Sequence, residues 1–188
     1  MTLLVLGVVI WSGAHFIPMA ARPLREACIG RIGEGPYKGL FSLSLIGAIT
    51  LMVMGWGRAE SVSVYSAPAW GAVAATPLML VSLFLFAASG VPTNVKRVLR
   101  HPQLTGFALW AFTHLLANGE RRSLVLFGVL GSWAIVSMLL INRRDGAWQK
   151  PDAVPLAAEM KAIVGGLVAF GLLFFAHEFL FGVSAAPL

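Results

Sequence analysis

Six separate apolar stretches, each close to the length needed to cross a lipid bilayer, occupy most of this 188-residue sequence. A transmembrane helix needs about 20 mostly apolar residues, because each residue advances the helix by about 1.5 Å and the hydrocarbon layer is about 30 Å thick. The sequence therefore predicts an all-α, polytopic membrane bundle of about six transmembrane helices. We place the spans near residues 2–21, 38–56, 70–91, 103–118, 123–142 and 162–183, within one domain that covers residues 1–188.

The composition excludes an ordinary soluble domain. Hydrophobic residues make up 58% of the chain and charged residues 12%, and the mean hydropathy is +0.82, whereas a soluble globular chain has about 45–50% apolar and about 25% charged residues. The stretches lack the alternating pattern of about ten residues that marks a transmembrane β-strand. The fourth stretch is the shortest and most polar, and the short connection at residues 119–122 predicts an antiparallel hairpin with the fifth.

The basic residues indicate the orientation of the bundle, because Lys and Arg accumulate on the cytoplasmic side of a membrane. Eleven of the fourteen lie in the first, third and fifth loops, and three lie on the opposite side. We therefore expect both termini outside the cytoplasm, in the periplasm of a Gram-negative cell. Basic residues follow the first span instead of preceding it, so we expect this span to be retained and not cleaved as a signal peptide.

The loops carry no recognisable catalytic motif. The net charge of +6 is explained by topology and by attraction to membrane lipids, not by nucleic acid binding. The single cysteine, Cys28, permits neither an internal disulfide nor a paired-cysteine metal motif. The longest loop, residues 143–161, contains Pro151 and Pro155 and is expected to lie along the cytoplasmic surface. Any chemistry must come from the spans.

Three of the four histidines, His15, His114 and His177, lie within predicted spans. An imidazole in hydrocarbon is costly unless it is partnered or coordinates something. One possibility is that these histidines only form hydrogen bonds between helices. No carboxylate is placed beside His15 or His114, although Glu178 adjoins His177. Three such residues in one chain favour a cofactor.

The neighbours of these histidines at helical spacing are aromatic. His15 shares a helix face with Trp11, and His114 shares one with Trp110 and Asn118. The third histidine lies in an aromatic wall of the kind that a flat ligand contacts, formed by Phe170, Phe174 and Phe181. Such stripes also serve simple helix packing, and this alternative stays open.

The ligand types favour a b-type haem. Imidazole suits zinc, copper and iron, whereas the absence of thiolates and the near absence of carboxylates in the spans argue against calcium, magnesium and carboxylate di-iron sites. Two axial imidazoles from facing helices, lined by Trp and Phe, describe a haem b site. Two basic clusters are available to pair with the propionates: Lys96, Arg97 and Arg100, or Arg121 and Arg122.

Four strings in the sequence carry a family resemblance: GEGPYKGLFS at residues 33–42, RHPQLTGFALWAFTHLLANG at 100–119, LFG at 126–128 and HEFLFGV at 177–183. Together they resemble the NnrU family of integral membrane proteins. The resemblance implies a bacterial inner-membrane protein linked to denitrification, through nitrite and nitric oxide metabolism. The family is related to the zeta-carotene isomerase of plants and cyanobacteria, a haem b membrane enzyme that isomerises a cis double bond. The resemblance thus implies a haem-binding protein without establishing isomerase activity, because one scaffold can carry different activities.

When the haem ligands of the related isomerase are matched to this sequence residue by residue, the resemblance implies that His15 and His114 are the axial ligands. Depth along the spans favours a different pair, because His114 and His177 both lie toward the outer side and His15 lies roughly 10 Å nearer the cytoplasm. Helix tilt and side-chain reach can absorb this offset, so we expect His15 and His114 as ligands, with His177 as the rival. Arg100 and His101, at the cytoplasmic mouth, are expected at the propionate side or at the start of the helix.

Three functions remain open from the sequence. The first is a haem-binding sensor, electron carrier or haem-handling factor that serves respiratory or denitrification redox proteins. The second is a haem-dependent cis–trans isomerase of a carotenoid or another isoprenoid. The third is a cofactor-free assembly or transport component. The oligomeric state is also open, because Gly165, Gly166 and Ala169 suit packing within one protomer or between two.

Overall fold

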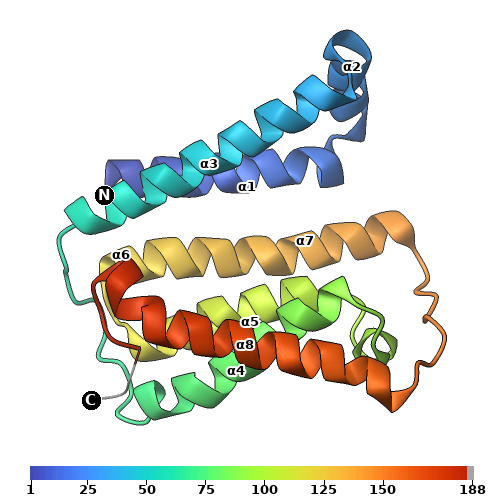
Figure 1. The fold of residues 1–188 in the computed structure, drawn as a ribbon. Coiled ribbons are helices and arrows are strands. Elements are labelled where there is room, and N and C mark those ends of the chain that lie inside the picture. The colour runs from blue at the N-terminus through green and yellow to red at the C-terminus, as the bar shows by residue number, and fades with distance from the viewer. Residues whose placement is uncertain (186–188) are drawn as a thin grey trace.

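The computed structural model describes residues 1–185, and helices are the only regular elements in that range. The all-α expectation is therefore confirmed (Figure 1). The short elements α6, η2 and α7 follow one another without a break and form one long helix, Arg121–Asp145. The elements are α1 (Thr2–Ala20), α2 (Arg22–Ile32), α3 (Glu34–Arg58), α4 (Gly71–Gly90), η1 (Asn94–Arg97), α5 (Pro102–Ala117), α6 (Arg121–Ser123), η2 (Leu124–Gly128), α7 (Val129–Asp145) and α8 (Leu156–Phe181).

Five of these helices are long and apolar enough to cross a membrane: α1, α3, α4, the helix Arg121–Asp145 and α8. The predicted fourth span is present as α5, but its 16 residues give a length of only about 24 Å at about 1.5 Å per residue. It packs between α4 and α7 inside the bundle. The outer surface is apolar, since Phe175 and Phe179 on α8 are 85% and 91% exposed. This is the surface of a protein whose solvent is lipid.

Several boundaries differ from those expected. The predicted first loop contains the eleven-residue helix α2, so Cys28 lies on a helix. Gly33 separates α2 from α3 with a φ of 86°, a conformation that glycine adopts without a steric penalty. The next span then begins at Glu34 instead of residue 38, because Pro36 is tolerated in the first turn of a helix. The last span begins at Leu156, directly after Pro155.

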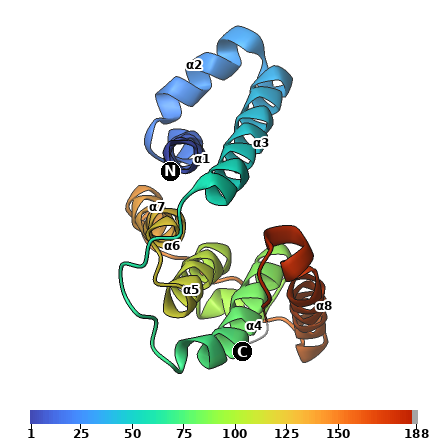
Figure 2. The same ribbon diagram turned by 90° about the vertical axis from the view of Figure 1, so that its left-hand side faces the viewer.

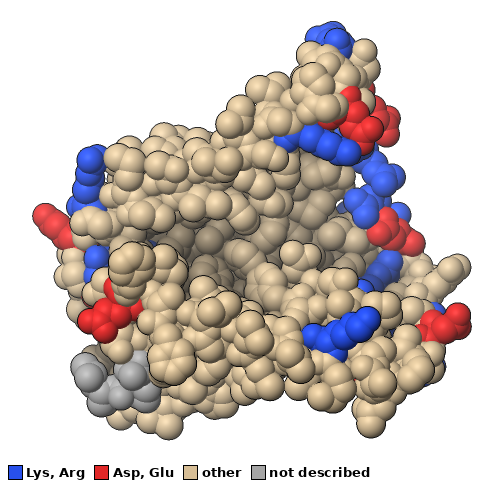
Figure 3. Space-filling model, viewed as in Figure 1, with Lys and Arg blue, Asp and Glu red and all other residues tan. Residues whose placement is uncertain are grey.

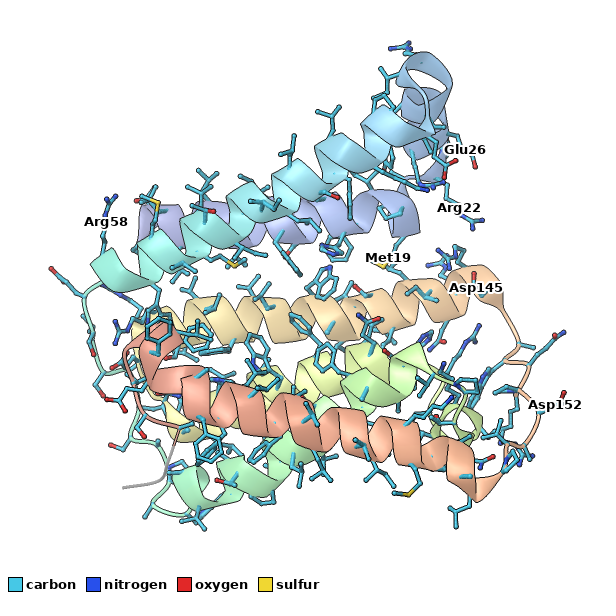
Figure 4. The ribbon with its side chains drawn as sticks, in the orientation of Figure 1. Met19, Arg22, Glu26, Arg58, Asp145 and Asp152 are labelled. Carbon is cyan, nitrogen blue, oxygen red and sulfur yellow. The ribbon has the colours of Figure 1, made fainter. Side chains whose placement is uncertain are left out.

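Consecutive long helices run antiparallel, and α8 ends at the same end of the bundle at which α1 begins (Figure 1). The eleven basic residues of the first, third and fifth loops therefore share one end. Figure 4 shows Arg22, Glu26, Asp145 and Asp152 at that end and Arg58 at the other. We call the two ends the basic end and the terminal end.

The bundle has two groups of helices joined through α7. One group is α1 with α2 and α3, the other is α4, α5 and α8, and α7 contacts both α1 and α5 (Figure 2). Within the second group, α8 packs mainly on α4. The last helix of the chain is therefore the one with the fewest neighbours.

Glycines allow the helices to approach closely. A Cβ atom at Gly55 on α3 would lie 2.3 Å from the backbone nitrogen of Leu4, and one at Gly166 on α8 would lie 2.8 Å from Cα of Phe84. At Gly106 on α5 it would lie 2.8 Å from the carbonyl oxygen of Ser82, and the Ser82 hydroxyl donates to the Gly106 carbonyl at 2.8 Å. Small residues and buried hydroxyls are the usual means of helix association in lipid. Gly166, left open from the sequence, thus packs α8 onto α4 within the protomer.

We expect Gly106→Leu to separate α4 from α5 and to destabilise the protein by about 1–3 kcal/mol or more, the usual cost of overpacking. Thermal unfolding of the purified protein in mild detergent measures this effect. Gly47→Leu is the matched control, because no atom of another residue lies within 4 Å of a Cβ built there. Equal unfolding temperatures for the two variants would contradict the proposed role of Gly106.

Candidate functional site

His114 lies at the centre of a cluster of rings near the terminal end of the bundle. Its imidazole stacks on Phe127, with ring centroids 4.2 Å apart and planes at 19°. Trp110, one turn earlier on α5, lies 5.0 Å from it. The imidazole of His177 on α8 lies 6.5 Å away, with the two planes inclined by 23°. The structure therefore brings together His114 and His177, the pair that depth along the spans favoured.

Each of the three span histidines is anchored through its Nδ1 atom by a backbone carbonyl. His15 bonds to the carbonyl of Trp11 at 2.9 Å, His114 to that of Trp110 at 2.9 Å, and His177 to that of Val183 at 2.8 Å. A carbonyl oxygen only accepts, so Nδ1 carries the proton and Nε2 presents its lone pair. None of the three Nε2 atoms is hydrogen-bonded within residues 1–185. This is the tautomer of an imidazole that binds a metal through Nε2.

A reversal of the chain after α8 holds the ring of His177. Gly182 adopts a φ of 73° and its N–H donates to the carbonyl of Glu178 at 2.8 Å. The turn carries the carbonyl of Val183 back to the imidazole. The partner of His177 Nδ1 is therefore a backbone group and not the adjacent Glu178 carboxylate.

Phe127, the ring stacked on His114, lies in the π-helical segment η2. A π-helical turn inside a longer α-helix shifts the side chains that follow it, and such turns are frequent at functional sites. Residues 124–128 read LVLFG, which contains no signal for this conformation. Sequence reasoning missed Phe127 for that reason.

The loop after α3 closes the end of α5 beside His114. The Tyr65 hydroxyl donates to the carbonyls of Leu115 and Asn118, the second at 2.9 Å, and the N–H of Val64 donates to the carbonyl of Gly119 at 2.8 Å. These bonds satisfy carbonyls that a helix end leaves unpaired. The Asn118 amide in turn donates to the carbonyl of His114 at 2.9 Å, so Asn118 braces the end of the helix.

His15 belongs to a second group of rings. Its neighbours are Trp11 on its own helix at 4.5 Å, Trp133 on α7 at 5.0 Å and Phe41 on α3 at 5.6 Å. The indole nitrogens of Trp11 and Trp133 are buried and have no hydrogen-bond partner among the described residues. Polar atoms buried without a partner are costly.

A chain of aromatic rings separates His15 from His114. Trp133, which contacts His15, lies 5.3 Å from Phe107, and Phe107 lies 5.0 Å from Trp110. The structure therefore does not place the imidazoles of His15 and His114, the expected ligand pair, in contact. It links them through intervening rings.

Arg100 and His101 lie at the basic end, away from His114. His114 lies thirteen positions after His101 in the sequence, about 20 Å along a helix at about 1.5 Å per residue. Arg100 donates to the carbonyl of Gly146 at 2.7 Å, and Nε2 of His101 lies 2.8 Å from the amide oxygen of Asn142. The basic residues nearest to His114 along the chain are instead Arg121 and Arg122, which open the helix Arg121–Asp145.

Arg122 is fixed at the terminal end by two contacts. Its guanidinium lies 4.6 Å from the ring centroid of Trp56, and its Nε atom lies 2.5 Å from a carboxylate oxygen of Glu120. The Glu120 carboxylate also accepts a hydrogen bond from Ser61. The hydrogen bond from Arg122, followed by that from Ser61, holds the pKa of Glu120 below its ordinary value of 4.5.

The histidine side chains suit a metal ion that is already bound by a cofactor, so that the protein supplies only one or two ligands. Among residues 1–185, no group of three or more His, Cys, Asp or Glu side chains is close enough to hold a metal ion. A porphyrin supplies four nitrogens of its own, and its iron needs only one or two imidazoles. Figure 3 shows that the face between α3 and α8 is hollowed, and that residues other than Lys, Arg, Asp and Glu line the hollow.

The fold and the ring cluster define a polytopic helical membrane protein with anchored histidines in its interior. The family model described as "NnrU protein" matches residues 3–185, and the chain therefore belongs to the NnrU family. Neither a curated protein nor a solved structure matches the chain.

We expect the thermal stability of the protein to fall as the pH is lowered below about 4.5, in part through Glu120. The folded pKa of this carboxyl is lowered, so its contribution is present above the unfolded pKa and is lost as the pH falls through the folded value. Because the pair is partly exposed, the effect should stay within about 0–1 kcal/mol. Glu120→Gln should show a weaker dependence on pH between about 5 and about 3, measured by thermal unfolding.

Glu60→Gln is the control for this measurement, because Glu60 adjoins Ser61 in the loop that contacts Glu120 and its carboxyl forms no salt bridge among residues 1–185. An identical pH profile for Glu120→Gln and the wild type would count against the Glu120–Arg122 pair.

Proposed function

We propose that this NnrU-family protein binds one haem b next to His114, and that it acts as a sensor, electron carrier or haem-handling factor in nitrite and nitric oxide metabolism. The observation that carries the proposal is the near-parallel pair of His114 and His177, each with Nδ1 anchored and Nε2 free. When bound between these two histidines, the haem would supply one-electron chemistry.

The separation of the two rings supports iron ligation. Two imidazoles that ligate one metal from opposite sides, each about 2 Å from it, have centroids about 6 Å apart. The centroids of His114 and His177 are 6.5 Å apart. The carbonyl bonds to Nδ1 fix the ring orientation and make Nε2 a better donor. The ligand pair that we propose is therefore His114 with His177, and it replaces the pair of His15 and His114 implied by the resemblance.

The surroundings of this pair also suit a porphyrin. Phe127 and Trp110 lie against His114, and Phe181 lies 4.9 Å from His177. These rings give the apolar wall that a porphyrin face needs. Arg121 and Arg122 lie at the same end of the bundle, and they replace Arg100 and His101 as the proposed partners of the propionates.

The uneven charge supports an orientation in which the basic end faces the cytoplasm. We place the protein in the bacterial inner membrane, with both termini in the periplasm. The haem would then lie toward the periplasmic side, where respiratory redox proteins are the proposed partners.

The absorption spectrum of the purified protein, oxidised and then reduced with dithionite, tests the proposal. We expect a Soret band, and we expect His114→Ala to lose most of the haem while the protein still inserts into the membrane, because the hydropathy of the spans is unchanged. His177→Ala should alter the low-spin spectrum, whereas His15→Ala should leave it unchanged.

If His15→Ala alters the low-spin spectrum and His177→Ala does not, the ligands are His15 and His114, the pair that the resemblance implies. Protein without any Soret band, even after it is incubated with added haem, would favour the cofactor-free assembly or transport component.

The hollow between α3 and α8 favours a second function, the haem-dependent isomerisation of a carotenoid or another isoprenoid. A long polyene requires an uncharged space that opens to lipid, and the hollow in Figure 3 has that character. Incubation of the reduced protein with a cis-carotene, followed by chromatography of the products, tests this function. If the haem-loaded protein leaves the cis-carotene unchanged, the isomerase function is contradicted and the non-catalytic function is favoured.

A further inference from the structure

A cavity of about 430 Å³ lies at the basic end of the bundle, away from the histidine pair. Side chains from five elements or loops line it: Ser89 on α4, Lys96 on η1, Arg100 before α5, Ile141 on α7 and Trp148 in the loop before α8. His101 and Gln103 add further polar groups, and no Asp or Glu of the described residues lines the cavity. Such a cavity favours an anion.

The frame of this cavity is built by specific hydrogen bonds between distant loops. The Asn94 amide donates to the carbonyl of Val154 at 2.9 Å and accepts from the Val154 N–H at 3.0 Å, and the Asn94 N–H donates to the Glu159 carboxylate. Arg100 is fixed to the carbonyl of Gly146 at 2.7 Å. These bonds fix η1, which carries Lys96, against the loop and helix that follow Trp148.

Lys96 is a cation without a partner in this frame. Its side chain forms no hydrogen bond or salt bridge within residues 1–185. Asp145, at the end of α7, is already paired with Arg144 at 2.5 Å, and the Glu159 carboxylate already accepts from the Asn94 N–H. The positive charge of Lys96 is therefore free to meet a ligand.

We propose that this cavity binds the phosphate group of an anionic phospholipid from the leaflet at the basic end. The ligand chemistry is a phosphate anion, which a phospholipid headgroup or a water-soluble organic phosphate can supply. We choose the lipid for two reasons. The cavity lies where α5 and α7 meet their charged loops, at the level of headgroups, and its lining combines the cations with the apolar Leu104 and Ile141 and with Trp148, a typical interface residue.

This site does not depend on the haem. Arg100 and His101, which we expected near the propionates, lie about 20 Å from His114 along α5 at about 1.5 Å per residue. Arg100 and His101 would contact the lipid phosphate instead of a haem propionate. Lipid binding can therefore be measured in protein with or without haem.

Native mass spectrometry of the detergent-purified protein tests the proposal by counting phosphatidylglycerol molecules that stay bound, with phosphatidylcholine as the neutral comparison. Wild type should bind phosphatidylglycerol preferentially, and Lys96→Gln should bind it about five-fold more weakly, because it loses one charged contact to the phosphate inside the cavity. The matched control is Arg97→Gln, since Arg97 is the next residue on η1 and does not line the cavity.

Equal binding by Lys96→Gln and Arg97→Gln, or equal binding of the two lipids by the wild type, would overturn the proposal. Glycerol 3-phosphate distinguishes the two sources. If it raises the unfolding temperature of the wild type but not of Lys96→Gln, while phosphatidylglycerol does not, the ligand is a soluble phosphate and the lipid is wrong. Lys96→Arg keeps the charge and should bind as the wild type does, which separates loss of charge from misfolding.

Discussion

The bond from an imidazole Nδ1–H to a backbone carbonyl is the interaction on which the interior of this protein depends. It satisfies the polar group that is most costly to place in hydrocarbon, and it does so without a carboxylate. At His15 and His114 the carbonyl belongs to the preceding turn of the same helix, that of Trp11 and of Trp110. The bond fixes the orientation of the ring relative to its own helix and leaves Nε2 without a hydrogen bond among the described residues. A packing role would not require one nitrogen to stay unbonded at all three positions.

The sequence alone predicts the fold well, because helices in lipid are specified by length and hydropathy. The number of helices and their alternation follow from the apolar stretches, including the short α5. The ends of the helices were less predictable. Helix α2 carries no long apolar run, and the starts of α3 and α8 depend on Pro36 and Pro155, residues that also suit loops.

The candidate site was only partly predictable. The Trp-x-x-x-His spacing correctly places Trp110 against His114, since i and i+4 share a helix face. Which histidines meet depends on tertiary packing that no spacing within one helix encodes. Phe127 reaches His114 from a π-helical turn, and Tyr65 bonds to the carbonyl of Leu115 from the loop after α3. Residue spacing along the sequence predicts neither contact. His101 directly precedes the first residue of α5, which is the helix-start role that the sequence predicts. The alternative role at the propionates does not suit the proposed haem, because that haem lies beside His114, near the other end of α5.

The sparse packing of α8 has a consequence for assembly. This helix rests mainly on α4, through Gly166, and it carries His177 at its far end. If His114 and His177 both bind the iron, as we propose, the iron would link α8 to the rest of the bundle. The free energy of coordination would then be shared with the docking of that helix. A freshly inserted chain without its prosthetic group would hold its final segment loosely, and a membrane protease would be able to distinguish it from the mature form.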